Sequence, residues 1–428
     1  MLCADQLDAG EFYDSGMLGD SPAATPRVFP LAAADQCVKC GMCLPHCPTY
    51  RVTLDEAESP RGRIALMQGL VTGALPPNAA LQGHLDRCLT CRACEVVCPA
   101  DVPYGRLIDS AREQLAERVP GRNRVPRLMA AVLTRRPLRF AVAALLWLYQ
   151  RLGLQRLVRA TRLLGRGPLA RLESLLPDIH LPHLPEASAE TRGAPVALFA
   201  NCTSPLVEPD TLEAATTLLE QLGCAVQVPE AQTCCGALHQ HAGHAAQARA
   251  CAARNVAAFA GAAPIVGVAS GCTAQLVEYP LLSADPAAAA FAGRVRDIHA
   301  FIAAHPALPQ LRFRPLDSRV LLHTPCTLRN VVRGEGAVRA LLERVPGLRI
   351  QAFDSHCCGA AGSYFLTQPT MADALALAKV EQAAAARPEY VLSSNAGCGM
   401  HLGAALRRGG ITVPVWHPLR LLARQLEH

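Results

Sequence analysis

The sequence predicts a multidomain chain with a small α-helical domain built around metal clusters, a helical linker, and an α/β module that occurs twice. A cysteine phrase is repeated within the first hundred residues, arginine and leucine dominate the stretch that follows, and strands with cysteines recur in the C-terminal half. At 428 residues the chain has room for two or three domains. We expect an acidic tail at 1–26, a cluster domain at 27–117, a linker at 118–192, and modules at 193–312 and 313–428.

The first 26 residues carry acidic side chains and no basic one. The acids are Asp5, Asp8, Glu11, Asp14 and Asp20. A secretory signal instead begins with basic residues and continues into an apolar core. We therefore expect the chain to stay in the cytoplasm, where its 19 cysteines serve as metal ligands and reduced thiols rather than as a disulfide framework.

Two runs of cysteine share the spacing C-x2-C-x2-C-x3-C-P. They are Cys37, Cys40, Cys43 and Cys47, followed by Cys88, Cys91, Cys94 and Cys98. This spacing lets three sulfurs from one loop reach three irons of a 4Fe-4S cube, and in paired sites the fourth cysteine ligates the other cluster. One cluster is therefore assigned to Cys37, Cys40, Cys43 and Cys98, and the second to Cys88, Cys91, Cys94 and Cys47. Zinc needs four ligands rather than two interlocked runs, so the expected fold here is a ferredoxin-type domain with two 4Fe-4S clusters.

The segment 118–172 holds thirteen arginines and no Asp or Glu, interleaved with leucines. Its uncharged run, 140–150, falls short of the roughly 20 residues that a membrane-spanning helix needs. A basic helix with an apolar face can lie on an anionic membrane surface or dock on a partner. Alternatively, its leucines pack on the protein's own domains and its arginines are solvated. Nucleic-acid binding is not expected, because neither interleaved aromatics nor a known nucleic-acid module is present.

Three features recur in the same order in the C-terminal half. A strand ends in a lone cysteine, a Cys-Cys-Gly follows, and another strand closes on Gly-Cys, with offsets of 124, 123 and 126 residues between the two copies. Short buried strands that alternate with helical stretches predict an α/β fold with largely parallel sheets. The cysteines fall at strand ends, where open α/β sheets place their ligand sites.

Each copy of this cysteine-rich (CCG) module offers four thiols. They are Cys202, Cys234, Cys235 and Cys272 in the first module, and Cys326, Cys357, Cys358 and Cys398 in the second. Two adjacent cysteines cannot share a corner of a cube as a C-x2-C loop does, but they can flank irons of an irregular cluster. Gly236 and Gly359 are expected to let the backbone pass close to inorganic sulfide. Cys3, Cys224 and Cys251 have no counterpart in the repeat, and we expect them to be structural.

Longer motifs give the chain a family resemblance. They are SPRGRI at 59–64, HLDRCLTCRACEVVCP at 84–99, SGC at 270–272, HTPCTL at 323–328, DSHCCGAAGSY at 354–364 and NAGCGMHL at 395–402. With these motifs the chain resembles the iron-sulfur subunits of bacterial glycolate oxidases, within a wider family that carries paired CCG domains.

The resemblance implies an electron-transfer subunit of a glycolate (D-2-hydroxy acid) dehydrogenase, an oxidoreductase acting on CH-OH. FAD-binding subunits would oxidise glycolate to glyoxylate, and this chain, itself not catalytic, would pass electrons toward a quinone-linked acceptor. It also implies a peripheral position at the cytoplasmic face of the inner membrane. The alternative is a subunit of a lactate-utilisation or heterodisulfide-reductase-like complex, with thiol/disulfide chemistry of its own on the CCG clusters.

The chain departs from its heterodisulfide-type relatives at the last cysteine of each module. Those relatives end each module in C-x2-C, whereas here residue 275 is Gln and residue 401 is His. His401 could serve with Cys398 as a nitrogen ligand, which would raise the potential of a cluster. One or two further iron-sulfur clusters are therefore expected in the CCG modules. The sequence contains no Gly-x-Gly-x-x-Gly after a strand, and so no nicotinamide or flavin fingerprint.

Overall fold

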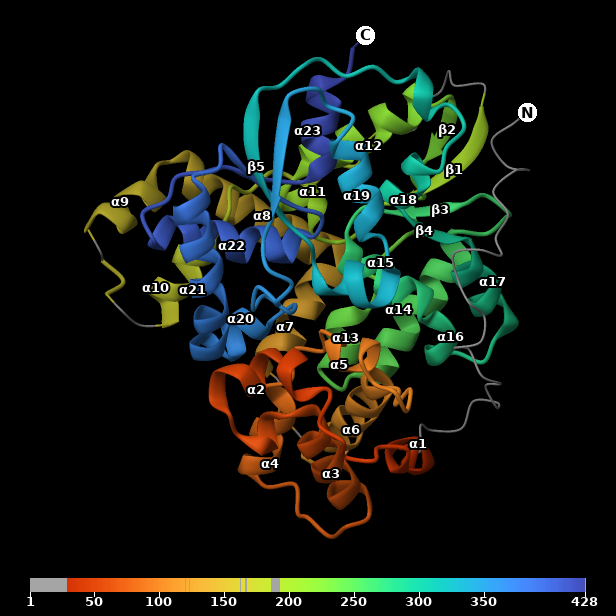
Figure 1. Cartoon of the computed structure of the whole chain (residues 1–428), viewed down its shortest axis with the longest axis vertical. Coiled ribbons are helices and arrows are strands. Elements are labelled where there is room, and N and C mark those ends of the chain that lie inside the picture. The colour runs from red at the N-terminus through yellow and green to blue at the C-terminus, as the bar shows by residue number, and fades with distance from the viewer. Residues whose placement is uncertain are drawn as a thin grey trace.

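The computed structural model describes residues 29–119, 121–122, 124–161, 163–165, 168–185 and 193–427. The predicted acidic tail lies outside this part of the chain. A helical N-terminal domain, red to orange in Figure 1, lies at one end of the molecule, and the two α/β modules, green and blue, lie at the other. The predicted domain boundaries remain predictions, and the first strand begins at Ala194.

Short helices make up the N-terminal domain. They are α1 (Leu31–Asp35), η2 (Leu44–His46), α2 (Pro48–Thr53), η3 (Glu56–Glu58), α3 (Pro60–Val71), α4 (Ala79–Asp86), α5 (Ala93–Val96) and α6 (Tyr104–Arg118). Proline opens both α2 and α3, because its missing N–H costs nothing at the first helical position. Ser59 caps α3 by accepting a hydrogen bond from the Gly62 N–H at 2.9 Å. Met67 and Leu107 are fully buried, so helices α3 and α6 enclose a small apolar core.

Arg63 on α3 is the central polar residue of this domain, with only 1% of its surface exposed. Its guanidinium forms an ion pair with the Glu58 carboxylate and donates to Thr49 Oγ1 at 2.9 Å and to the His84 carbonyl at 2.7 Å. Arg87 pairs with the same carboxylate. This buried network joins the segment after the first cysteine run to the helix before the second run, and so holds the two runs together.

Four helices form the linker: α7 (Arg124–Thr134), α8 (Arg136–Arg151), α9 (Leu154–Thr161) and α10 (Pro168–Leu175). Some of their arginines bind the protein itself. Arg171 forms an ion pair with Asp373, and Arg139 donates to the Cys202 carbonyl at 3.4 Å. Large leucines nevertheless remain exposed, among them Leu145 at 69% and Leu152 at 64%. Among the described residues no helix is both long and apolar enough to cross a membrane.

The first module contains β1 (Ala194–Phe199), α11 (Ser204–Val207), α12 (Pro209–Gln221), β2 (Cys224–Gln227), α13 (Ala237–His241), α14 (Ala245–Ala258), β3 (Ile265–Gly267), α15 (Ser270–Val277), α16 (Tyr279–Leu282), α17 (Pro286–Arg294), β4 (Val295–Asp297) and α18 (Ile298–Ala303). The 3-10 turn η4 (Leu308–Gln310) follows it. All strand pairs of its sheet are parallel, in the order β2-β1-β3-β4.

The second module contains β5 (Ser318–His323), the π-helix η5 (Leu328–Val332), α19 (Glu335–Leu342), β6 (Leu348–Ala352), α20 (Tyr364–Thr367), α21 (Pro369–Ala386), β7 (Tyr390–Ser393), α22 (Ala396–Arg408), β8 (Val415–Trp416) and α23 (Pro418–Gln425). Its sheet is also parallel, in the order β6-β5-β7-β8. The prediction of parallel α/β sheets is thus confirmed. In both sheets the strand order reverses between the first and third strands, which is the switch point where such sheets bind ligands.

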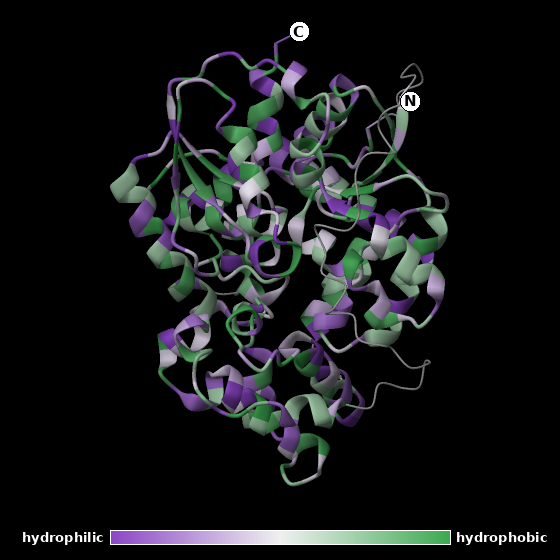
Figure 2. Ribbon diagram, turned by 45° about the vertical axis from the view of Figure 1, so that its right-hand side comes forward, coloured by the Kyte–Doolittle hydropathy of each residue, from purple (hydrophilic) through white to green (hydrophobic). Residues whose placement is uncertain are grey.

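The structure repeats with the register of the cysteines. Strand β5 begins 124 residues after β1, β6 begins 124 after β2, and α21 begins 124 after α14. The two modules share one apolar core, to which both β1 and β5 contribute through Leu198 and Leu322. The C-terminal helix α23 packs on α12 of the first module. Figure 2 shows the central strands largely as hydrophobic and the surrounding helices as mixed.

Candidate iron-sulfur sites

The first three cysteines of the first run and the last cysteine of the second run line one cavity. Its sulfur-bearing residues are Cys37, Cys40, Cys43 and Cys98. Lys39 and Gly41 have positive φ angles of 58° and 88°, which curl the loop around Cys40. Arg61 holds the loop by donating to the Lys39 carbonyl at 2.9 Å. Cys40 is exposed, so this outer site lies at the surface of the protein.

A second cavity is lined by the other four cysteines of the predicted pair of clusters. They are Cys47, Cys88, Cys91 and Cys94. The loop repeats the first one, because Thr90 and Arg92 have φ angles of 50° and 59° at the positions equivalent to Lys39 and Gly41. Burial raises the pKa of Cys94 well above its usual value. Burial therefore favours the neutral form of the Cys94 thiol.

Three polar groups reach the sulfurs of the inner site, and sequence reasoning missed all three. The Tyr104 hydroxyl donates to Cys88 Sγ at 3.6 Å, and the Thr90 N–H contacts the same sulfur at 3.4 Å. Thr49 Oγ1 lies 3.3 Å from Cys47 Sγ. Hydrogen bonds to sulfur stabilise the more negative state of a cluster and so tune its potential.

The four predicted thiols of the first module lie together at the carboxyl ends of its strands. Hydrogen bonds from Cys202 and Cys235 hold the pKa of Cys234 well below its usual value. A hydrogen bond with Cys272 contributes to a raised pKa at Cys235, so the four sulfurs form a connected set. The Asn255 amide donates to the Cys234 carbonyl at 3.1 Å and to the Tyr279 hydroxyl at 2.8 Å. The same hydroxyl donates to the Cys235 carbonyl at 3.0 Å, so an amide and a phenol hold the Cys-Cys loop.

The second module repeats this set with its own four cysteines. Hydrogen bonds from Cys326 and Cys358 hold the pKa of Cys357 well below its usual value. Cys398 hydrogen-bonds to Cys358 and also accepts from the Asn395 amide at 3.2 Å. All four predicted thiols are thus brought together.

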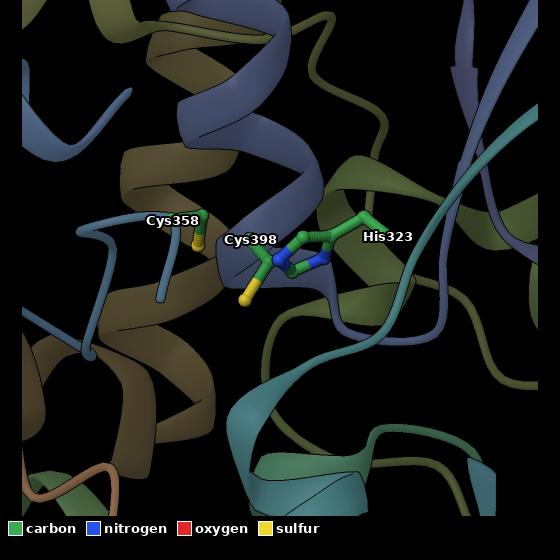
Figure 3. Close-up of side chains that lie close together, drawn as sticks. All are labelled: His323, Cys358 and Cys398. Carbon is green, nitrogen blue, oxygen red and sulfur yellow. The ribbon is translucent and has the colours of Figure 1, made fainter. Parts of the chain in front are cut away.

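The two histidines near the second set are placed differently. A ring nitrogen of His323, at the end of β5, lies within 4.8 Å of the sulfurs of Cys358 and Cys398, and the three buried side chains point toward one another (Figure 3). His401, the nitrogen ligand suggested by spacing, is not part of this three-residue group. Its Nε2 lies 3.3 Å from the Ala372 carbonyl, its ring stacks on Phe365, and its Nδ1 has no hydrogen-bond partner in the described part of the chain.

The loop of the inner site touches both modules. Asn330 donates to the Cys91 carbonyl at 2.7 Å, and Cys91 packs against the apolar cluster that contains Cys357, Cys358 and Cys398. On the other side, Arg92 forms an ion pair with Glu278 of the first module. The inner site therefore lies between the modules, with its sulfur ligand candidate Cys91 directed toward the second.

Gly236 and Gly359 have positive φ angles of 93° and 87°. Only glycine adopts this backbone conformation easily. Their close approach to inorganic sulfide remains a prediction, and both also pack closely against neighbouring backbone. A Cβ at Gly359 would lie 2.6 Å from the Ala372 carbonyl, and one at Gly236 would lie 3.3 Å from that of Ala248. These glycines therefore allow the Cys-Cys loop to pack against helices α21 and α14.

The two remaining described cysteines are not members of the predicted sets, although Cys251 packs in the same apolar cluster as Cys202, Cys234 and Cys235. Cys224 is buried at the start of β2, where its sulfur lies 3.6 Å from His305 Nε2. Cys251 is buried on α14, and burial raises its pKa to about 12. Cys3 lies outside the described residues.

Comparison with known proteins identifies the family. The chain matches the 4Fe-4S dicluster domain over residues 33–102, the cysteine-rich domain over 196–277 and 320–403, and the linker region of the glycolate oxidase iron-sulfur subunit over 126–176. It is 34% identical over 410 residues to the "Probable glycolate oxidase iron-sulfur subunit" of Bacillus subtilis, covering 88% of this chain and 90% of that protein. It belongs to the glycolate oxidase iron-sulfur subunit family.

Two other relatives show how the similarity to glycolate oxidase subunits compares with the similarity to a lactate utilization protein. The "Glycolate oxidase iron-sulfur subunit" of Escherichia coli is 32% identical over 415 residues, covering 91% of this chain and 94% of that protein. "Lactate utilization protein A" of a Geobacillus species is 28% identical over 234 residues, which covers 53% of this chain and 98% of that protein. The glycolate oxidase relatives thus match over nearly the whole chain and the lactate relative over about half.

Within the family, the matched segments correspond to the parts of the structure. The linker match covers helices α7 to α10, and each cysteine-rich match begins in the first strand of a module and ends in the helix that follows its third strand. The family resemblance drawn from the motifs is thus confirmed. Which cysteines bind which cluster remains a prediction.

Proposed function

We propose that this chain is the electron-transfer subunit of a glycolate (D-2-hydroxy acid) dehydrogenase complex. FAD-binding subunits oxidise glycolate to glyoxylate, and this chain carries the electrons toward a quinone-linked acceptor. The observation that carries the proposal is the sequence of sulfur-lined sites: an outer site at the surface, an inner site, and a second-module thiol set in contact with Cys91. The 4Fe-4S clusters supply one-electron redox chemistry when bound.

The residues around the outer site suit the docking of a partner. Cys40 is exposed, and its neighbours Val38 and Met42 are 72% and 55% exposed, although both are apolar. A small apolar rim around an exposed redox ligand is a surface that a flavin-bearing subunit can cover. We propose this rim as the entry side for electrons.

The residues around the inner site orient and tune it. Tyr104, Thr90 and Thr49 direct their polar groups at its sulfurs, and the Arg63–Glu58 pair fixes the two loops that supply those sulfurs. Asn330 and Arg92 hold the Cys91 loop against the two modules. The chain thus positions redox centres, and the chemistry on glycolate belongs to the flavin subunits.

The linker supports a peripheral membrane position. The exposed leucines Leu145 and Leu152 belong to a segment, 118–172, that holds thirteen arginines and no acidic residue. Apolar side chains surrounded by arginine match the chemistry of an anionic lipid surface. We expect co-sedimentation with phosphatidylglycerol vesicles and not with phosphatidylcholine vesicles, and loss of it when both leucines are changed to Glu.

The central experiment removes the sulfur that joins the inner site to the second module. The complex is purified anaerobically with Cys91→Ser, and glycolate is added. We expect the flavin to be reduced as in the natural complex, while electron delivery to a quinone is abolished. Cys251→Ser, at a buried cysteine outside the predicted sets, is the matched control and should leave both steps intact. Normal quinone reduction by the Cys91→Ser complex would contradict the proposal.

A further inference from the structure

The two modules differ at one position beside their thiols. Phe199 ends β1 and His323 ends β5, and each lies three residues before the lone cysteine of its module. Phe199 packs on Phe259, with ring centroids 5.8 Å apart, inside an apolar core. His323 is equally buried but carries an imidazole at the same point of the fold. At this position of the fold, the duplication has therefore placed a nitrogen donor in the second module and an apolar ring in the first.

The His323 imidazole lies close to two sulfurs and is held in place by a hydrogen bond. One of its nitrogens lies within 4.8 Å of the Cys358 and Cys398 sulfurs (Figure 3). Its Nδ1 lies 3.0 Å from Ser393 Oγ on the neighbouring strand β7. Histidines that ligate metals commonly use their second nitrogen for such a hydrogen bond, which fixes the ring orientation. The first module has Gly267 at the end of β3, so it lacks this hydroxyl as well as the imidazole.

Another group among the described residues also combines a histidine with two further potential ligands, and its chemistry is different. It consists of Asp55, Glu58 and His84. The Glu58 carboxylate is already neutralised by Arg63 and Arg87, so a cation has little to gain there. The group around His323 contains sulfur and nitrogen donors, which suit iron and zinc.

We propose that the second module binds an iron-sulfur cluster with mixed ligation, in which the His323 imidazole joins the thiolates of Cys326, Cys357, Cys358 and Cys398. Five donors, two of them adjacent in sequence, exceed the four of a closed tetrahedral zinc site. A neutral imidazole in place of a thiolate raises the potential of an iron-sulfur centre. This site is therefore more oxidising than an all-thiolate one. The inference rests on the proposed function in one respect only, which is that the centre next to Cys91 takes part in electron transfer.

The experiment exchanges residues between the modules. His323→Phe gives the second module the first module's residue, and His401→Gln does the same at the rival histidine. The full chain is purified anaerobically and brought to its paramagnetic states with dithionite or ferricyanide. Pulsed EPR then detects nitrogen bound to iron, and iron and zinc are counted per chain. Neither readout needs glycolate or a partner, so failure of the proposed function leaves this test valid.

We expect a directly bound nitrogen in the natural chain and in His401→Gln, and its loss in His323→Phe with a shift of one centre to lower potential. Labelling the natural chain with ¹⁵N-histidine must change the nitrogen coupling, which keeps the test decisive if His323→Phe does not fold. Three results overturn the proposal: no nitrogen coupling, coupling that disappears in His401→Gln instead, or zinc in place of the additional iron.

Discussion

The two cysteine-rich modules have the same strand order and the same register, yet they hold their Cys-Cys loops by different means. In the first module Asn255 and Tyr279 bind the loop carbonyls. Lys379 occupies the position of Asn255 in the second, where it is fully buried, pairs with the Asp354 carboxylate and donates to its carbonyl at 2.9 Å. The comparison teaches that duplication preserved the sulfurs and the backbone, while the residues that support them diverged.

The two modules also differ in the parts of the protein that they contact. The second set of thiols borders Cys91 of the inner site, whereas the first is linked to that loop through the Arg92–Glu278 ion pair. Helix α7 of the linker packs on α13 of the first module, and Thr134 Oγ1 lies 3.3 Å from His239 Nε2. The second module thus borders the inner site with its thiols, whereas the first contacts helix α7 of the linker.

The largest expected difference concerns electron transfer. Cys358→Ala should slow quinone reduction by the assembled complex by more than about tenfold, as for loss of a metal-supporting group. Cys235→Ala at the matching position should change the rate little, because the first set of thiols does not border Cys91. Rates are measured with glycolate as donor. Equal losses in both variants would show that the modules serve electron transfer alike.

A smaller effect is expected on stability in the first module. Asn255→Leu removes the partners of the Thr233 N–H, the Cys234 carbonyl and the Tyr279 hydroxyl. Leaving buried polar groups unpaired should lower the free energy of unfolding by about 3 kcal/mol. Chemical denaturation measures it, with Asn330→Ala as a control that removes a single hydrogen bond. A loss as small as that of the control would mean that the network is not essential to the loop.

A further difference is a pH dependence that arises in the second module. Burial lowers the pKa of Lys379 from 10.5 to about 7. Between these values the unfolded chain binds one more proton than the folded chain, so the free energy of unfolding rises with pH across this window. Asn255, at the matching position of the first module, does not titrate, so it contributes no pH dependence to the free energy of unfolding. Denaturation of the natural chain and of Lys379→Met across the window should show a shallower slope in the variant, and parallel slopes would refute the assignment.

Much of this architecture was predictable because it follows from the spacing of the cysteines along the sequence. The cysteine offsets predicted the repeat and the parallel sheets, and the shared fourth cysteine predicted the sets that line the outer and inner cavities. His323 was not predicted as part of a site, although it stands in the HTPC motif. Its proximity to Cys398 depends on β5 pairing with β7, a long-range contact that spacing along the chain does not encode. The burial of Arg63 was not predictable for the same reason, since it depends on η3 and α4 folding over its side chain.

The exposure of Cys40 and the burial of Cys88 and Cys94 have a consequence for damage by air. Oxidants dissolved in water reach an exposed iron-sulfur ligand first, so deterioration should begin at the rim and move inward. Protein handled aerobically should then lose iron from the outer site before it loses iron from the inner site.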